Sequence, residues 1–367
     1  MEGKKEGFRP LIGITMGDPA GIGPEIAVKA LGRPELYEKC RPLVVGDARI
    51  LRRALEFTGR TDLKIRPVKR PSEGGYAPGT IDVLDLPVAD PAEIETGKVS
   101  AAAGNAAFAC VKEVIRLAME KEVDATVTNP LNKEAMNLAG HHYSGHTEIY
   151  AHFTGTKRYT MMLAHHNLRV VHVSTHVSLR EACDRVKKER ILEVIRIADQ
   201  ACRRMGIKTP SIGVAGLNPH CGEGGLFGKE EIEEIAPAVQ AARKEGIRAE
   251  GPVPADTVFS KARGGWYDCV VAMYHDQGHI PLKVVGFVYD EALGKWGAVE
   301  GVNITLGLPV IRTSVDHGTA FDQAGTGEAS ELSLINAIDY AISFALGENC
   351  NHNDTRKQEP NTKEVRE

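Results

Sequence analysis

Residues 268–279 (DCVVAMYHDQGH) join a short apolar run to a polar end. The apolar part, 269–273, is too short for a core helix and is bounded by polar residues, which is typical of a buried parallel strand. The polar part contains His275 and Asp276. Because ligands of open α/β sheets bind just beyond the carboxyl ends of strands, an imidazole and a carboxylate at this point are placed for chemistry.

Two other apolar-rich runs, 169–176 (RVVHVSTH) and 212–220 (IGVAGLNPH), also end in a histidine. We therefore expect His176, His220 and His275 to follow three strands at corresponding positions. Three neutral imidazoles with an open fourth position are a common catalytic metal set. A single such histidine is more often a capping or core residue, but its recurrence after three strands favours a metal site.

The composition indicates a globular protein of more than one domain. At 367 residues the chain exceeds the size at which one hydrophobic core stops growing, so we expect two domains with a cleft between them. Apolar content of 42% and charged content of 26% are ordinary for this class. A net charge of −4 and an aromatic content of 5% argue against a nucleic-acid-binding protein.

No apolar run reaches the length of a membrane span, and the start MEGKKEGFRP has no signal-peptide core. We therefore expect a cytoplasmic protein without a membrane partner. The seven cysteines are an odd number without a C-x-x-C pair, which indicates reduced core residues. Cys221 lies next to His220, and its alternative interpretation is a metal ligand or a reactive thiol.

Apolar periodicity predicts alternating strands and helices, and hence an α/β fold with a mainly parallel sheet and right-handed crossovers. Strands are expected at 11–16, 42–46, 81–86, 125–128, 302–306 and 310–313. Helices are expected at 24–31, 50–57, 100–120, 189–205, 229–243 and 332–346. The polar segment 347–367 has no periodicity and is predicted to be a disordered tail.

Three glycine-rich or polar segments are candidate ligand sites. Residues 17–25 (GDPAGIGPE) form a turn before a helix whose N-terminus would favour an anion, although a tight strand–helix turn explains the glycines equally well. Residues 316–327 (DHGTAFDQAGTG) are predicted to be a ligand-binding loop. Residues 144–148 (SGHTE) suit a phosphate or carboxylate, with a helix cap as the equal alternative. His165 and His166 lie in a polar context and are predicted to be solvated.

Long motifs give the sequence a resemblance to the 4-hydroxythreonine-4-phosphate dehydrogenase family over residues 11–346. They include GDPAGIGPE (17–25), TNPLNK (128–133), GHTE (145–148), GLNPHCGEGG (216–225), GPVPADT (251–257), AMYHDQGH (272–279), GVNITLGLP (301–309) and RTSVDHGTAFD (312–322). Two of them also resemble segments of isopropylmalate and isocitrate dehydrogenases. The resemblance implies two α/β/α domains of that type, with the active site in the cleft and completed across a homodimer interface.

The resemblance also implies roles for individual residues. The metal ligands would be His176, His220 and His275, and the substrate-binding residues His146, Thr147, Lys283, Asn303 and Arg312. The cofactor-binding residues would be Gly17, Gly21, Gly23, His317, Gly318, Thr319, Ala320, Asp322 and Gly325. Lys283, Asp256 and Asp276 are the catalytic candidates, the two aspartates for proton transfer or for orienting an imidazole. Residues 1–130 with 300–346 would form the cofactor-side domain, and 131–299 the metal, substrate and dimerisation domain.

The implied reaction is NAD-dependent oxidation and decarboxylation of a 4-phosphorylated four-carbon 3-hydroxy acid, with NADP as the alternative cofactor. The divalent metal is expected to be zinc, with cobalt, nickel, manganese or magnesium as alternatives. The long link 287–301 leans toward the family's branch that acts on 4-phospho-D-threonate or D-erythronate, rather than the pyridoxine-pathway enzymes that act on 4-phosphohydroxy-L-threonine. A metal-dependent hydrolase or aldolase without nicotinamide is the rival class, and a non-catalytic metal or nucleotide binder is the third.

Overall fold

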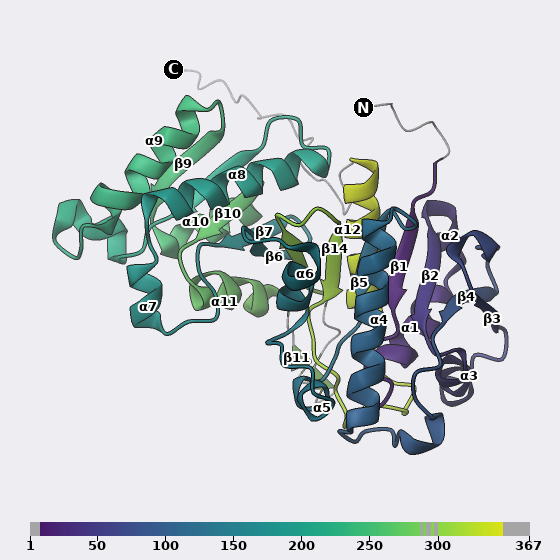
Figure 1. Cartoon of the computed structure of the whole chain (residues 1–367). Coiled ribbons are helices and arrows are strands. Elements are labelled where there is room, and N and C mark those ends of the chain that lie inside the picture. Colours follow the sequence, from purple (N-terminus) through teal and green to yellow (C-terminus); the bar gives the residue numbers. More distant parts are fainter. Residues whose placement is uncertain (1–7, 287–288, 291–294, 297–299, 348–367) are drawn as a thin grey trace.

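The computed structural model describes residues 8–286, 289–290, 295–296 and 300–347, so residues 348–367 of the predicted tail and most of the link 287–301 lie outside it. One 12-stranded sheet runs through the molecule in the order β3-β4-β2-β1-β5-β14-β13-β6-β7-β10-β8-β9 (Figure 1). Its strands are β1 (Leu11–Thr15), β2 (Arg41–Gly46), β3 (Lys64–Val68), β4 (Thr80–Asp85), β5 (Ala125–Thr128), β6 (Thr160–His165), β7 (Leu168–His172), β8 (Ser211–Ala215), β9 (Arg248–Val253), β10 (Cys269–Ala272), β13 (Val302–Leu306) and β14 (Arg312–Val315). A separate hairpin pairs β11 (Tyr289–Asp290) with β12 (Lys295–Trp296).

The longer helices connect these strands. They are α1 (Gly23–Leu31), α2 (Pro34–Lys39), α3 (Ala48–Phe57), α4 (Ala101–Met119), α5 (Lys133–Leu138), α6 (His146–Thr154), α7 (Leu179–Asp184), α8 (Lys188–Arg204), α9 (Ala236–Lys244), α10 (Ala255–Arg263), α11 (His275–Gly286) and α12 (Leu332–Leu346). Short helical turns are η1 (Pro71–Glu73), η2 (Pro91–Glu93), η3 (Pro219–Gly225) and η4 (Glu231–Ile235). The predicted α/β class with a mainly parallel sheet is confirmed.

The sheet consists of two parallel halves that run in opposite directions. Strands β3, β4, β2, β1, β5 and β14 are parallel, and so are β7, β10, β8 and β9. Between them, β14–β13, β13–β6 and β6–β7 are antiparallel. The strands of 1–130 with 300–346 fill one side of the β13–β6 pair and those of 131–299 the other, as Figure 1 shows. The division into two domains remains a prediction, because backbone pairing continues across that boundary.

Helices pack on both faces of the sheet, and the register identifies the faces. Gly13 of β1 faces Val114 of α4, whereas Thr313 of β14 donates a hydrogen bond to the carbonyl of Ala337 in α12 (2.7 Å). Register pairing through β5 places those two residues on opposite faces. Helix α11 packs against Val170, which lies on the same face of the sheet as α4.

Two predicted elements differ from the structure. The strand expected at 310–313 runs from Arg312 to Val315 instead, because residues 309 and 310 still belong to the bend that follows β13. The helix expected at 229–243 is divided into the π-helical turn η4 and α9, and Pro237 lies in the first turn of α9. Proline has no N–H for the helical ladder, which accounts for the break. Within the described residues, no helix is both long enough and apolar enough to span a membrane.

Candidate active site

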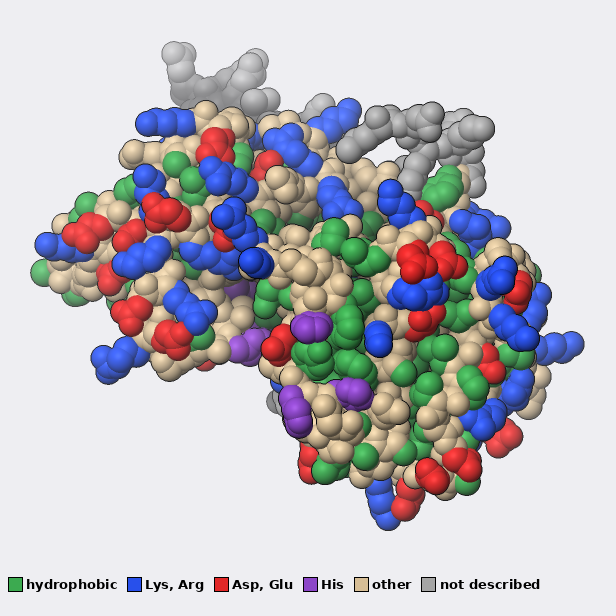
Figure 2. All heavy atoms as spheres, in the orientation of Figure 1, with side chains coloured by type: hydrophobic (Ala, Val, Ile, Leu, Met, Phe, Trp, Pro, Cys, Tyr) green, Lys and Arg blue, Asp and Glu red, His purple; other side chains and the backbone are tan. Residues whose placement is uncertain are grey.

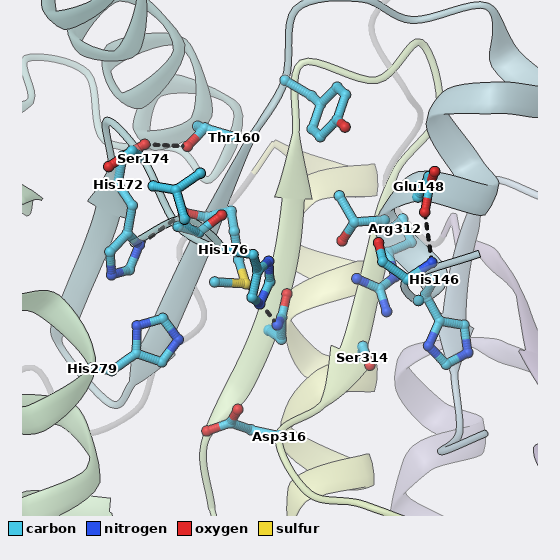
Figure 3. Close-up of a pocket in the computed structure, with 18 of the residues that line it drawn as sticks. His146, Glu148, Thr160, His172, Ser174, His176, His279, Arg312, Ser314 and Asp316 are labelled. Atoms are coloured by element: carbon cyan, nitrogen blue, oxygen red, sulfur yellow. Dashed lines mark hydrogen bonds between the residues drawn. The ribbon is translucent and has the colours of Figure 1, made fainter. Parts of the chain in front are cut away.

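A pocket of about 1220 Å³ opens over the central strands, on the face shared by α4 and α11. Figure 2 shows histidine side chains gathered around the hollow between the two halves of the molecule. In the close-up of Figure 3, His172 and His279 lie on one side of the pocket and His146 and Arg312 on the other. Strand residues that line it are Thr160, Met161, His172, Asn303, Arg312, Ser314 and Val315.

The antiparallel register gathers Met161, His172, Asn303, Arg312 and Ser314 on one face. Asn303 pairs with Ser314 on β14 and with Leu163 on β6, and Thr305 pairs with Arg312. Residues paired in register point to the same side of a sheet, and side chains alternate along each strand. The pocket floor is therefore a product of pairing between segments that are far apart in the sequence.

Arg312 provides a buried positive charge in the floor. It is 3% exposed, and its guanidinium donates to the hydroxyls of Thr305 (3.0 Å) and Thr128 (2.8 Å). Its Nε is buried without a partner. Burial lowers the pKa of Arg312 to about 10, so it stays charged at neutral pH. A buried guanidinium held by neutral hydroxyls is suited to an anionic ligand.

The other predicted substrate residues on this side lie close to Arg312. Burial, assisted by the charge of Arg312, lowers the pKa of His146 well below its usual value, and its Nε2 is buried without a partner. The Thr147 hydroxyl lies 3.2 Å from that of Thr305, and the Asn303 Oδ1 is a further buried acceptor without a partner. The structure thus brings together His146, Thr147, Asn303 and Arg312.

Lys283 of α11 reaches the pocket rim through an ion pair. Its Nζ lies 2.5 Å from the Asp316 carboxylate, and Asp316 is one of the lining residues. Lys133 at the start of α5 also lines the pocket and adds a second cation there. Lys133 therefore faces the pocket directly, whereas Lys283 reaches it only through its ion pair with Asp316.

A row of imidazoles lies on the opposite side, where His172, His176 and His279 line the pocket and His275 lies outside the lining. The rings of His275 and His279 stack with centroids 3.6 Å apart, His172 lies 4.8 Å from His279, and His176 lies 5.8 Å from His275. Burial lowers the pKa of His172 to about 3 and that of His279 to about 4. Burial and then the neighbouring His275 lower the pKa of His176. Uncharged rings of this kind can act as metal ligands or hydrogen-bond acceptors.

The three predicted metal ligands follow adjacent parallel strands, because β10 pairs with both β7 and β8. His176 and His275 are neighbours. His220 is exposed on η3, where it has a φ of +52°, and it does not line the pocket. Within the described residues, the His/Cys/Asp/Glu group with ligand atoms all within 4.8 Å is a different one, described below. A site made of all three histidines therefore remains a prediction.

The two candidate aspartates lie beside the predicted ligands. The Asp276 carboxylate is 2.7 Å from His275 Nδ1 and is 70% exposed, a position suited to orienting that ring. Asp256 is exposed in the first turn of α10, and its charge contributes to raising the pKa of the Cys221 thiol, after burial and Glu231. Asp256 therefore lies close to the turn that carries His220.

The two predicted cofactor segments contact each other. The Ile22 N–H donates to the Thr319 carbonyl (3.0 Å), and a Cβ on Gly21 would lie 2.9 Å from the same oxygen. Gly17 and Gly23 are likewise buried against backbone atoms. Packing explains these three glycines, and their contact with a cofactor stays a prediction. In the loop, His317 and Gly318 line the pocket, while Thr319, Ala320, Asp322 and Gly325 do not.

Comparison with known proteins identifies the family. The family described as "Pyridoxal phosphate biosynthetic protein PdxA" matches residues 38–341. The chain is 48% identical to D-threonate 4-phosphate dehydrogenase of Pectobacterium atrosepticum over 91% of this chain and 99% of that protein. It is 50% identical to the enzyme of the same name from Cupriavidus necator, over 92% and 98%.

The chain belongs to the PdxA family. The fold agrees with a solved 4-hydroxythreonine-4-phosphate dehydrogenase from Klebsiella pneumoniae, with a TM-score of 0.80, 49% identity and coverage of 92% and 99%. A terephthalate 1,2-cis-dihydrodiol dehydrogenase from Burkholderia xenovorans is similar at a TM-score of 0.65, 33% identity and coverage of 92% and 98%. The family resemblance seen in the motifs is thus confirmed, and this PdxA protein is an enzyme of the dehydrogenase class.

Sequence reasoning missed several lining residues of this PdxA protein. His172 and His279 were given no role, although His275 and His279 have the i, i+4 spacing that places two side chains on one helix face. Lys133 and Ser314 were also given no role, although they lie in the quoted motifs 128–133 and 312–322, whereas Asp316 belongs to the predicted ligand-binding loop. No local signal indicates that Ser314 lines the pocket, because its place there depends on the long-range order of the strands.

Proposed function

We propose that this protein is an NAD-dependent, divalent-metal-dependent dehydrogenase that oxidises and decarboxylates a 4-phosphorylated four-carbon 3-hydroxy acid. The observation that carries the proposal is the buried Arg312, which has only hydroxyl partners among its hydrogen bonds and lies in a histidine-walled pocket. The favoured substrate is 4-phospho-D-threonate, because relatives with that activity in their names are 48% and 50% identical over nearly their whole length. The product would be dihydroxyacetone phosphate.

Arg312, His146, Asn303 and Thr147 would hold one anionic end of the substrate. A planar guanidinium can bind phosphate or carboxylate with two parallel hydrogen bonds, and the buried Asn303 and His146 atoms offer further contacts. Lys283, which is paired with Asp316, is proposed as the residue that binds the second anionic group and assists proton transfer.

His176, His220 and His275 are proposed to hold the metal. The donor set suits zinc, with cobalt, nickel, manganese or magnesium as alternatives, and the lowered pKa of His176 leaves its ring available as a ligand. When bound, the cation would supply Lewis acidity at the substrate hydroxyl and NAD would supply the hydride acceptor. Asp276 would fix the orientation of His275, and Asp256 would do the same near His220.

We include a homodimer in the proposal, with the active site completed by a second copy. What supports it is the position of His220, which is exposed on η3 and outside the lining of the pocket within one chain. The loop 317–325 would bind NAD, with NADP as the alternative, through His317 and Gly318 at the pocket rim.

The test is NADH formation with 4-phospho-D-threonate, 4-phospho-D-erythronate and 4-phosphohydroxy-L-threonine. We expect absorbance at 340 nm to rise with the first substrate and to disappear after chelation or in His275→Ala, and to persist in the surface control His142→Ala. The last substrate would yield 3-amino-2-oxopropyl phosphate. Loss of phosphate or carbon–carbon cleavage without NADH would overturn the proposal in favour of a hydrolase or aldolase.

A further inference from the structure

We propose a second metal site, separate from the pocket, formed by His165, His166 and Glu300. One ligand atom from each of the three residues lies within 4.8 Å of the other two. The Glu300 carboxylate is 3.1 Å from His166 Nε2 and 3.9 Å from His165 Nε2. The two imidazole rings meet edge to face, with centroids 4.3 Å apart.

Strand register brings Glu300 and His166 together. Val302 of β13 pairs with Ala164 of the antiparallel strand β6. Continuing this ladder by two residues on each strand places Glu300 opposite His166. The backbone pairing therefore brings the two residues side by side, and their side chains meet in the 3.1 Å contact.

The turn between β6 and β7 brings His165 into the same group. His165 pairs with Leu168, so His166 and Asn167 form a two-residue hairpin turn. His166 has a φ of +50°, which is uncommon for a residue with a side chain. A positive φ is what a two-residue hairpin turn requires at its first central residue, so the backbone geometry of His166 follows from the turn.

Hydrogen bonds to the backbone hold the ligand-bearing segments in place. The Tyr340 hydroxyl donates to the His166 carbonyl (3.0 Å), and the Asn336 amide donates to the Glu300 carbonyl (2.9 Å), both from α12. The Asn167 side chain donates to the Arg263 carbonyl (2.9 Å). Preorganised ligands lose less conformational entropy on binding a metal.

The chemistry of the group suits a zinc-like cation. Two imidazoles and one carboxylate are a common zinc donor set, and a metal at ordinary bond lengths would separate its ligands by about 3.4 Å. Water would complete the coordination.

The site lies at the opposite end of β6 from the pocket, which is lined by Thr160 and Met161 at the start of the strand. A metal there would fasten the β6–β7 turn to the residue that leads into β13, and so stabilise the antiparallel centre of the sheet. It takes no part in the proposed reaction, and the inference does not rest on that reaction.

The experiment measures Zn²⁺ bound per chain after chelation, reloading and gel filtration of the full-length protein. The double variant His176→Ala/His275→Ala removes the pocket ligands and isolates the second site. We expect it to retain one Zn²⁺ per chain, and to lose that ion when either His166→Ala or Glu300→Gln is added. Adding His142→Ala, an exposed histidine outside the group, should leave the ion in place.

Measurement of Tm excludes misfolding as the cause of a loss of bound Zn²⁺. Without metal, the double variant and its His166→Ala derivative should have equal Tm values, and Zn²⁺ should raise the Tm of the first only. No bound Zn²⁺ in the double variant, or Zn²⁺ retained after both His166→Ala and Glu300→Gln, would show that the group is an ordinary surface ion pair. If the pocket proves to bind no metal, the same loss on His166→Ala in the wild-type chain still supports the second site.

Discussion

The imidazole rings of His275 and His279 are stacked, with centroids 3.6 Å apart and an angle of 13° between their planes. Residues four apart on an α-helix lie on one face, so α11 presents both rings together. His279 Nδ1 lies 2.9 Å from the His275 carbonyl, which can only accept a hydrogen bond. The proton of the neutral His279 ring is therefore on Nδ1, and Nε2 is left as an acceptor.

This relationship predicts a role for His279 in turnover. His279→Leu should lower kcat/KM for the phosphorylated hydroxy acid about tenfold, because one hydrogen bond of about 1.4 kcal/mol is lost. His279→Gln should retain part of the activity, since an amide can still accept. Steady-state NADH formation measures the effect, and a kcat/KM for His279→Leu equal to that of wild type would exclude the role.

Arg312 is predicted to be essential for activity but not for stability. Arg312→Met should lower kcat/KM about 100-fold or more, because a buried charge pair with the substrate is lost. Its Tm should not fall. Folding lowers the pKa of Arg312 from 12.5 to about 10. Burial of the charged guanidinium therefore destabilises the folded state at every pH below about 10. This destabilisation decreases as the pH rises from 10 toward 12.5.

Scanning calorimetry and substrate kinetics on the same preparation check this pair of expectations. Arg312→Lys provides the matched control, because it keeps the charge but loses the planar fork. A Tm that drops sharply in Arg312→Met would show that the guanidinium has a structural role through Thr305 and Thr128.

Asp18 is predicted to make stability depend on pH. Burial raises the pKa of Asp18 from 3.8 to about 6, against backbone hydrogen bonds from Ala20 and Asn132 that lower it. The folded protein therefore holds this proton more tightly than the unfolded chain, and stability falls as the pH rises from about 4 to 6. Asp18→Asn removes the effect and should be more stable at pH 7.5 by up to about 3 kcal/mol.

Urea unfolding at pH 7.5 and 4.5 tests the prediction for Asp18. The gain from Asp18→Asn should be smaller at pH 4.5 by about 2 kcal/mol, because the wild-type carboxyl is then protonated in the fold. The exposed Asp184→Asn serves as the control and should show no such difference. A gain that is the same at both pH values would contradict the assignment.

Close packing around position 278 is predicted to require a glycine, which has no side chain. A Cβ there would lie 2.3 Å from His172 Nε2 and 2.8 Å from Val170 Cγ1. Gly278→Ala should destabilise the protein by about 1–3 kcal/mol, although alanine normally favours a helix. Gly264→Ala, where the nearest atom is 3.3 Å away, should have a much smaller effect.

A double-mutant cycle gives the decisive measurement for this contact. In the His172→Ala background, Gly278→Ala should cost at least 1 kcal/mol less than in wild type, because the ring that it meets has been removed. Equal free-energy costs in the two backgrounds would show that His172 is not the obstacle.

Part of this architecture is readable from local patterns. The apolar runs before His176, His220 and His275 predicted strands that are indeed adjacent and parallel, although β7 and β8 end several residues before their histidines. The prediction that His165 is solvated was wrong, because it is the last residue of β6 and is half-buried. A polar sequence context does not reveal that the end of a helix, here Gly286, packs against the ring.

The sequence by itself determined the α/β class, the family and the position of its histidines after buried strands, because apolar periodicity and long motifs are local properties of the chain. Only the tertiary structure decided that the two parallel halves of the sheet run in opposite directions, with the antiparallel strands β13 and β6 between them. That reversal gathers Arg312, Asn303 and His146 in one pocket and places Glu300 opposite His166. Register between distant strands is set by long-range pairing and packing, which no stretch of sequence specifies alone.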